Sequence, residues 1–188
     1  QKGGVGKTTT AINIATAMAA SGWRTLLVDI DPQGNASTGL GISSRDRDYS
    51  TYELLMREGT AQQCIQHTRI PKLDCIPATQ DLSGAEVELV GEEDRIDRLK
   101  TMLSEVDSSY DVCFFDCPPS LGLLTVNALS AADSLLVPLQ CEFFALEGLS
   151  QLLQTVERIR SRFNPGLTIL GVALTMYDRR NRLTDQVA

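Results

Sequence analysis

The first nine residues of the chain, QKGGVGKTT, limit what it can fold into more than any other stretch. Glycines at positions 3, 4 and 6 let the backbone turn tightly and point several amide N–H groups inward. Residues 8–20 are rich in alanine and isoleucine, and we expect a helix there whose positive N-terminal end faces the same turn. Such a turn and helix form a cradle for phosphate. The stretch therefore predicts that the chain binds and hydrolyses a nucleoside triphosphate.

Lys7 and Thr8 complete this loop with the side chains that phosphate chemistry needs. Lys7 supplies a positive charge for the outer phosphates, and the Thr8 hydroxyl can bind Mg²⁺. The loop departs from the general pattern G-x-x-x-x-G-K-[ST], because Gln1 stands in place of the first glycine. Lys2 sits at the front of the loop, where a lysine serves no need of the fold. We interpret Lys2 as a second cation for phosphate, donated to a neighbouring subunit.

Apolar runs and helical patterns alternate along the rest of the chain. Residues 24–31 read RTLLVDID and residues 110–116 read YDVCFFD, both typical of buried parallel strands that end in acids. Further strands are expected at residues 73–77, 134–139 and 167–175, and helices at 51–57, 92–106, 121–131 and 146–163. This alternation predicts an α/β fold with a mostly parallel sheet flanked by helices on both faces. With its loop, that is a P-loop NTPase fold of the deviant Walker A kind.

Asp29, Asp31 and Asp116 lie where two of these strands end. In open α/β sheets ligands bind beyond the carboxyl ends of the strands, so we expect all three acids near the phosphate loop. Asp116 suits a Walker B role, holding Mg²⁺ directly or through water. Asp29 and Asp31 are two residues apart and can face the same side. One of the two could orient or deprotonate the attacking water, and the other could support the metal shell or a lysine.

Charge and composition argue against several other classes of protein. The formal net charge of −7 disfavours a protein that coats nucleic acid through bulk charge. Two local basic groups are Arg158, Arg160 and Arg162, interpreted as a solvated helix face, and the arginines within 179–182. The only histidine, His67, lies in a polar stretch, which excludes a Ser-His-Asp arrangement. The five cysteines form no CxxC pair, which favours reduced thiols in a cytosolic protein. The apolar runs are too short to span a bilayer.

The two ends of the sequence carry an expectation of their own. A phosphate loop normally joins a buried strand to a helix, and that strand aims the loop. Here the sequence opens on the loop and closes just as a new segment, residues 183–188, begins. We therefore expect a single P-loop ATPase domain over residues 1–188 that is truncated at both ends, without its first strand and its C-terminal part.

Five blocks spread over the whole chain resemble the ParA (Soj-like) partition ATPases, within the wider ParA/MinD group. They are KGGVGKTTTAINIA from Lys2, LLVDIDPQGNAS from Leu26, FFDCPPSLGLLTVNAL from Phe114, VPLQCEFFALEGL from Val137 and LTMYDRRNRL from Leu174. Related families differ at these blocks. MinD proteins lack the DPQGN continuation, nitrogenase iron proteins carry cluster cysteines in glycine-rich loops, and iron–sulfur carrier ATPases usually show a CxxC.

The resemblance implies a role for each motif residue. Lys2 matches the signature lysine that reaches the partner's phosphates in an ATP-sandwiched dimer. Asp31 matches the acid associated with hydrolysis, Asp116 the Walker B acid, and Met176 a position near the adenine. The implied nucleotide-binding set is Lys2, Gly3, Gly4, Val5, Gly6, Lys7, Thr8, Thr9 and Met176. The implied catalytic set is Lys2, Lys7 and Asp31, and Mg²⁺ falls to Thr8, to Asp116 through water and, as an option, to Asp29 through water.

The resemblance also implies a function, with ATP and Mg²⁺ as cofactors. In this family an ATP-dependent homodimer binds DNA nonspecifically, and a ParB-type partner at a centromere-like site stimulates slow hydrolysis. The cycle segregates chromosomes or plasmids, so we expect a cytoplasmic, nucleoid-associated protein that needs no membrane. Two alternatives stay open. One is a MinD-like membrane-associated positioning ATPase, and the other is a nonfunctional fragment of a partition ATPase.

Overall fold

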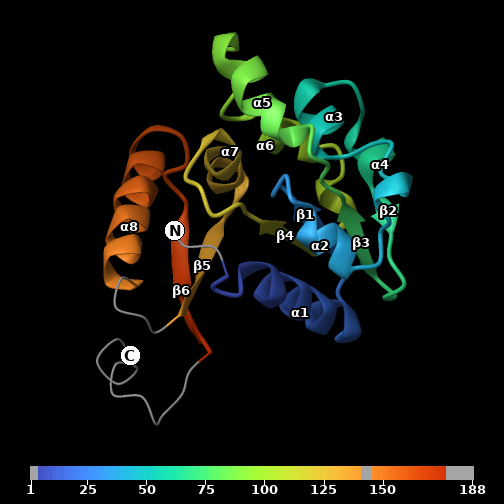
Figure 1. Ribbon diagram of the computed structural model, residues 1–188, viewed down its shortest axis with the longest axis horizontal. Helices are drawn as coiled ribbons and strands as arrows, with labels where there is room; N and C mark the ends of the chain where they lie inside the picture. The colour runs from blue at the N-terminus through green and yellow to red at the C-terminus, as the bar shows by residue number, and fades with distance from the viewer. Residues whose placement is uncertain (1–3, 141–144, 177–188) are drawn as a thin grey trace.

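The computed structural model describes residues 4–140 and 145–176, and its strands lie in the middle of the molecule (Figure 1). The strands are β1 (Thr25–Asp29), β2 (Gln66–His67), β3 (Leu73–Ile76), β4 (Val112–Asp116), β5 (Ser134–Gln140) and β6 (Thr168–Thr175). Within the described ranges they form a four-stranded sheet in the order β2-β3-β1-β4 and a two-stranded sheet of β5 and β6. Every pairing except β2 with β3 is parallel. The prediction of a mostly parallel sheet is confirmed.

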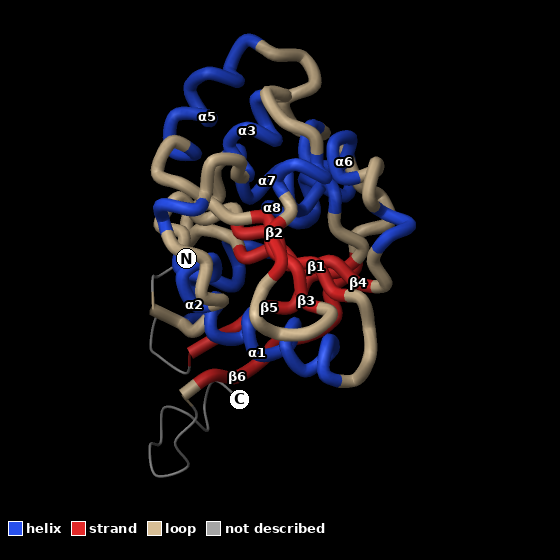
Figure 2. The backbone as a smooth tube through the Cα atoms, turned by 90° about the vertical axis from the view of Figure 1, so that its right-hand side faces the viewer, coloured by secondary structure: helices blue, strands red, loops and turns tan. Residues whose placement is uncertain are grey.

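Helices cover both faces of the four-stranded sheet, as Figure 2 shows. On one side lie α1 and α2, and on the other lie α3, α5, α6 and α7. The helices are α1 (Lys7–Ala20), α2 (Asn35–Gly39), α3 (Thr51–Met56), α4 (Ala61–Cys64), α5 (Leu82–Glu88), α6 (Arg98–Leu103), α7 (Leu123–Ala131) and α8 (Ala145–Arg162). The side chains of β1 alternate between these faces. Leu26 and Val28 pack into the core beneath α3, α6 and α7, whereas Leu27 packs into the core beneath α1. A third core joins α8 to β5 and β6.

Most predicted elements are found within a few residues of their expected bounds. The capping box before α3 is present: the Ser50 hydroxyl accepts the backbone N–H of Tyr52 at 3.1 Å, and the Glu53 carboxylate accepts the backbone N–H of Ser50 at 2.8 Å. The helix predicted over 92–106 is shorter, since α6 spans only 98–103. Residues 92–97 instead fold around Arg98, whose buried guanidinium bonds to the carboxylates of Glu92 at 2.6 Å and Asp94 at 3.0 Å. Another difference is a set of short elements with no counterpart among the predicted ones, namely α2, α4, α5 and β2.

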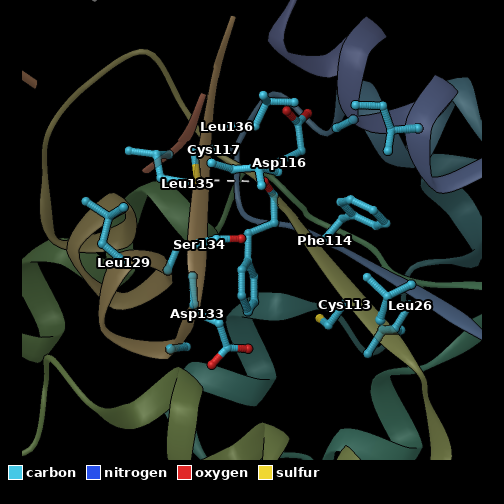
Figure 3. A pocket seen from close by; sticks show the side chains of 18 of the residues that line it. Leu26, Cys113, Phe114, Asp116, Cys117, Leu129, Asp133, Ser134, Leu135 and Leu136 are labelled. Carbon is cyan, nitrogen blue, oxygen red and sulfur yellow. Dashed lines mark hydrogen bonds between the residues drawn. The ribbon is translucent and has the colours of Figure 1, made fainter. Parts of the chain in front are cut away.

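A cavity of about 860 Å³ separates β4 from β5. Figure 3 shows Cys113, Phe114 and Asp116 of β4 on one side of it, and Leu135 and Leu136 of β5 on the other. Residues of α1 and α7 line it as well. The edges of β4 and β5 that border this cavity have no strand partner among the described residues. The expectation that a further strand precedes the phosphate loop stays a prediction.

Within the described ranges, no helix combines the length and the apolar character that crossing a membrane requires.

Candidate functional site

The three acids predicted at the strand ends come together in the fold. Asp29 and Asp116 are the last residues of β1 and β4, and the parallel register places them side by side. The backbone N–H of Ile30 donates to the carbonyl of Asp116 at 3.0 Å, which ties the start of the following turn to β4. Asp29, Asp31 and Asp116 are all buried. Two apolar strands that run in parallel and end at the same level are therefore what gathers the carboxylates.

Asp29 is satisfied entirely by its own chain. Its Oδ1 accepts the backbone N–H of Asp31 at 3.2 Å, and its Oδ2 accepts both the backbone N–H of Ser37 at 2.8 Å and the Ser37 hydroxyl at 2.7 Å. Burial raises the pKa of this carboxyl, and the hydrogen bonds from Ser37 and Asp31 oppose that rise. Its possible contact with Mg²⁺ through water stays a prediction, and both of its oxygens already serve the protein.

Asp31 sits in a tight turn between β1 and α2. Its Oδ1 accepts the backbone N–H of Gln33 at 3.0 Å, and its carbonyl accepts that of Gly34 at 2.8 Å. Gly34 has a φ of 61°, and a Cβ there would lie 2.3 Å from Nη1 of Arg47 and 3.0 Å from the carbonyl oxygen of Ala78. The DPQGN block therefore needs glycine for its left-handed backbone and for the close approach of Arg47.

Asp116 is buried like Asp29, but its carboxylate is incompletely bonded. Within the described residues, Oδ2 of Asp116 has no hydrogen-bond partner. Burial is the main cause that raises the pKa of Asp116 to about 6, and the charges of Asp29 and Asp31 raise it further. A hydrogen bond from Thr8 and the charge of Lys7 act in the opposite direction. A buried carboxylate oxygen without a partner, beside a threonine hydroxyl, fits the hard oxygen ligands that Mg²⁺ takes.

The phosphate loop is described from Gly4 onward, and Gln1, Lys2 and Gly3 lie outside the described residues. Gly4 and Gly6 have φ values of 83° and 84°, the left-handed backbone that the glycine pattern predicts. Lys7 and Thr8 begin α1 directly after Gly6 and are both partly buried, whereas Thr9 is exposed. The helix N-terminus and the left-handed turn therefore meet at the place where the sequence predicts the phosphates.

Thr175, at the end of β6, contacts the loop although it is distant from it in the sequence. Its hydroxyl donates to the carbonyl of Val5 at 2.8 Å, and its Cγ2 lies 3.6 Å from where a Cβ on Gly6 would stand. Sequence reasoning missed Thr175 because nothing in its local pattern signals a contact 170 residues away. The next residue, Met176, has a φ of 52° and a 66% exposed side chain. Its role near the adenine stays a prediction.

Other candidates from the sequence lie elsewhere or make ordinary contacts. His67 is on the surface, where its Nδ1 lies 2.7 Å from the carboxylate of Asp74. Arg158 and Arg162 are exposed on α8, and Arg160 bonds to Glu157 and to the carbonyl of Leu167. The arginines within 179–182 lie outside the described residues. Across 4–140 and 145–176, no three histidine, cysteine, aspartate or glutamate side chains group together as a metal site.

The chain is similar to known proteins over most or all of its length. A family model described as an AAA domain matches residues 1–169. The chromosome partitioning protein ParA of Caulobacter vibrioides is 57% identical over 190 residues, covering 100% of this chain and 71% of that protein. The sporulation initiation inhibitor protein Soj of Bacillus subtilis is 53% identical over 187 residues, covering 100% of this chain and 74% of that protein.

Two solved structures superpose on nearly the whole chain. A Mycobacterium smegmatis protein described as cobyrinic acid a,c-diamide synthase, with bound ATP analog and magnesium, superposes with a TM-score of 0.94 at 40% identity. The match covers 99% of this chain and 76% of that one. A plasmid partition protein from Borrelia burgdorferi superposes with a TM-score of 0.84 at 28% identity, covering 98% of this chain and 79% of that one.

Proposed function

The chain belongs to the ParA/Soj family of chromosome partition proteins, and from that premise we propose that it is an ATP-driven partition switch. It binds ATP with Mg²⁺, dimerises, holds nonspecific DNA and releases it after slow hydrolysis, which a ParB-type partner stimulates. The protein works in the cytoplasm, on the nucleoid. The names of the relatives support this purpose, and the M. smegmatis structure with its ATP analog and magnesium supports the choice of ligands.

The observation that carries the proposal is the unpartnered oxygen of Asp116 beside the phosphate loop. A protein seldom leaves a buried carboxylate oxygen without a partner unless a ligand completes it. Thr8, through a hydrogen bond, and Lys7, through its charge, both lower the pKa of this carboxyl. Thr8 and Asp116 are therefore the residues that would hold Mg²⁺, the latter through a water. When bound there, Mg²⁺ would neutralise charge on the transferred phosphoryl group.

The remaining side chains divide the work of hydrolysis. Lys7 binds the outer phosphates at the start of α1, where the amide N–H groups of the loop converge. Asp31 orients the attacking water and takes up its proton. Phosphoryl transfer depends on such positioning and charge neutralisation more than on covalent chemistry, so this set is sufficient for slow turnover.

The direct test is retention of the full-length protein on nonspecific DNA, with Lys7→Ala as the control. We expect the wild type to be retained with ATP and released with ADP, and Lys7→Ala to be retained with neither, because it lacks the cation for the phosphates. Equal DNA binding by both proteins, with and without ATP, would show that the proposed switch is wrong.

Lys2 is proposed to act across the dimer. We expect Lys2→Ala to bind ADP as the wild type does, because the lysine reaches the phosphates of the partner subunit and not those of its own. ATP-dependent dimerisation, followed by light scattering, should fall by roughly tenfold or more for the loss of one buried charged contact. Dimer formation equal to that of the wild type contradicts this role.

A further inference from the structure

Ser37, the last residue of the LLVDIDPQGNAS block, has a hydroxyl that both donates and accepts a hydrogen bond next to Asp29. This side chain is fully buried in α2. The hydroxyl donates to Oδ2 of Asp29 at 2.7 Å and accepts the backbone N–H of Ala78 at 3.0 Å. The backbone N–H of Ser37 donates to the same carboxylate oxygen at 2.8 Å. One residue therefore joins the end of β1, the helix α2 and the chain that follows β3.

The turn that carries Asp31 is anchored at both ends by these bonds. At its start, the backbone N–H of Asp31 donates to Oδ1 of Asp29. At its end, Ser37 binds the other oxygen of the same carboxylate. The buried side chain of Asp29 thus closes residues 29–37 into a ring. The backbone carbonyl of Asp29 accepts the Thr51 hydroxyl at 2.7 Å.

Arg47 supports the outer side of the same turn. Its guanidinium donates to the hydroxyl of Thr38 at 2.8 Å and to the carbonyl of Ala78 at 2.8 Å. Ala78 is therefore bonded on its N–H by Ser37 and on its carbonyl by Arg47. The Asp31 carboxylate itself accepts the backbone N–H of Gln33 within the turn. Its position therefore depends on the anchors around it.

We propose that Ser37 is a positioning residue for hydrolysis, acting through Asp29 to hold the Asp31 carboxylate where it meets the attacking water. The inference rests on the proposed role of Asp31 in turnover. It assigns Asp29 to the support of the turn, since both of its oxygens accept hydrogen bonds from the protein. A displacement of a catalytic group by about 1 Å can lower the rate on the order of a hundredfold. Loss of a hydroxyl that fixes the turn should therefore lower the rate of hydrolysis.

The experiment compares Ser37→Ala with Ser130→Ala in the full-length protein. Ser130 is an equally buried serine that also donates its hydroxyl to an aspartate, Asp97, but it lies in α7. We expect Ser37→Ala to lower the kcat of ATP hydrolysis by roughly tenfold or more. The KM for ATP and the Kd for ADP with Mg²⁺ should stay within about twofold of wild type. Ser130→Ala should keep wild-type values for all three quantities.

A second readout needs no nucleotide. In the ligand-free protein, hydrogen exchange at the backbone N–H groups of Asp31, Ser37 and Ala78 should be roughly tenfold faster or more in Ser37→Ala and unchanged in Ser130→Ala. Ser37→Cys, close in volume but a weak hydrogen-bond donor, should show an intermediate kcat and carries the test if the alanine variant does not fold.

The outcomes separate this proposal from the function it rests on. If the wild type hydrolyses no ATP, the proposed function fails, and the exchange data still decide whether Ser37 holds the turn. Wild-type kcat in Ser37→Ala, equal losses in Ser130→Ala, or a loss of ADP affinity that matches the loss of kcat would each overturn the positioning role. Unchanged exchange at Asp31 and Ala78 would overturn it as well.

Discussion

Asp29 and Asp116 are both aspartates and lie at the same level of two neighbouring strands, but they differ in how far the protein satisfies their carboxylates with hydrogen bonds. Their side chains are equally hidden, at 0% and 1% exposed. Asp29 accepts three hydrogen bonds from the protein, whereas one oxygen of Asp116 accepts none from the described residues. The comparison teaches that burial alone does not identify a functional acid. The acid that the fold satisfies supports the site, and the acid that it leaves open is available to a ligand.

Asp31 extends this comparison to a third acid and gives the largest expected effect. We expect Asp31→Ala to reduce ATP turnover by about 10²–10⁴-fold, the range that a positioned general base contributes. Nucleotide affinity should remain, because the group positions water and does not hold the phosphates. Single-turnover hydrolysis and ADP titration measure the two quantities. An affinity loss as large as that of Lys7→Ala would count against this assignment.

Replacing each strand-end acid by alanine tests the comparison through stability. Asp29→Ala leaves three buried donor groups without their acceptor, and each such loss costs about 1–3 kcal/mol. We expect its free energy of unfolding in urea to fall by about 3 kcal/mol or more. Asp116→Ala should cost far less, because it removes an incompletely bonded charge. If both variants lose the same stability, the distinction between the two acids is wrong.

Asp116→Asn tests the same distinction through pH, in protein free of nucleotide and Mg²⁺. Burial raises the folded pKa of Asp116 to about 6, above the unfolded value of 3.8, so its contribution to stability is lost as the pH rises through about 6. The asparagine variant avoids this loss. At pH 8 it should be more stable than wild type by about 3 kcal/mol, and at pH 5 by about half as much.

The control for the pH experiment is Asp48→Asn, which removes an exposed aspartate. The change in unfolding free energy that this variant shows is the effect of losing one surface charge, and it is subtracted from the change seen in Asp116→Asn. The stabilised Asp116→Asn protein should also lose its Mg²⁺-dependent gain in nucleotide affinity, since a functional group is often kept at a cost in stability. If the stability difference between Asp116→Asn and wild type were the same at pH 5 and pH 8, burial of the Asp116 carboxylate would not be destabilising the protein.

The parts of the site that sequence alone could predict are those with a local signal. Glycines followed by a lysine and a threonine define the loop, and apolar runs that end in acids place Asp29 and Asp116 at one edge of a parallel sheet. The supporting contacts have no such signal. Ser37 meets Ala78 across 41 residues, and Thr175 meets Val5 across 170. Only the assembled fold brings these pairs together.

The helix predicted over 92–106 is a second case in which a tertiary contact without a local signal decides the structure. Its apolar spacing was sound for residues 98–103, but the pattern carries no information on the buried guanidinium of Arg98. Glu92 and Asp94 turn toward that charge, and the chain before α6 follows them. Tertiary contacts of a single buried cation can therefore override a helical pattern over one and a half turns.

The parallel register of β1 and β4 has a consequence for how this chain can change in length. Side chains alternate along a strand, so one residue inserted or deleted within Thr25–Asp29 or Val112–Asp116 would turn its terminal acid to the opposite face. The exposed single turn of 3-10 helix at Ser44–Asp46 imposes no such parity. Among descendants of this sequence, gains and losses of residues should accumulate in turns of that kind and be purged from the two strands that carry the acids.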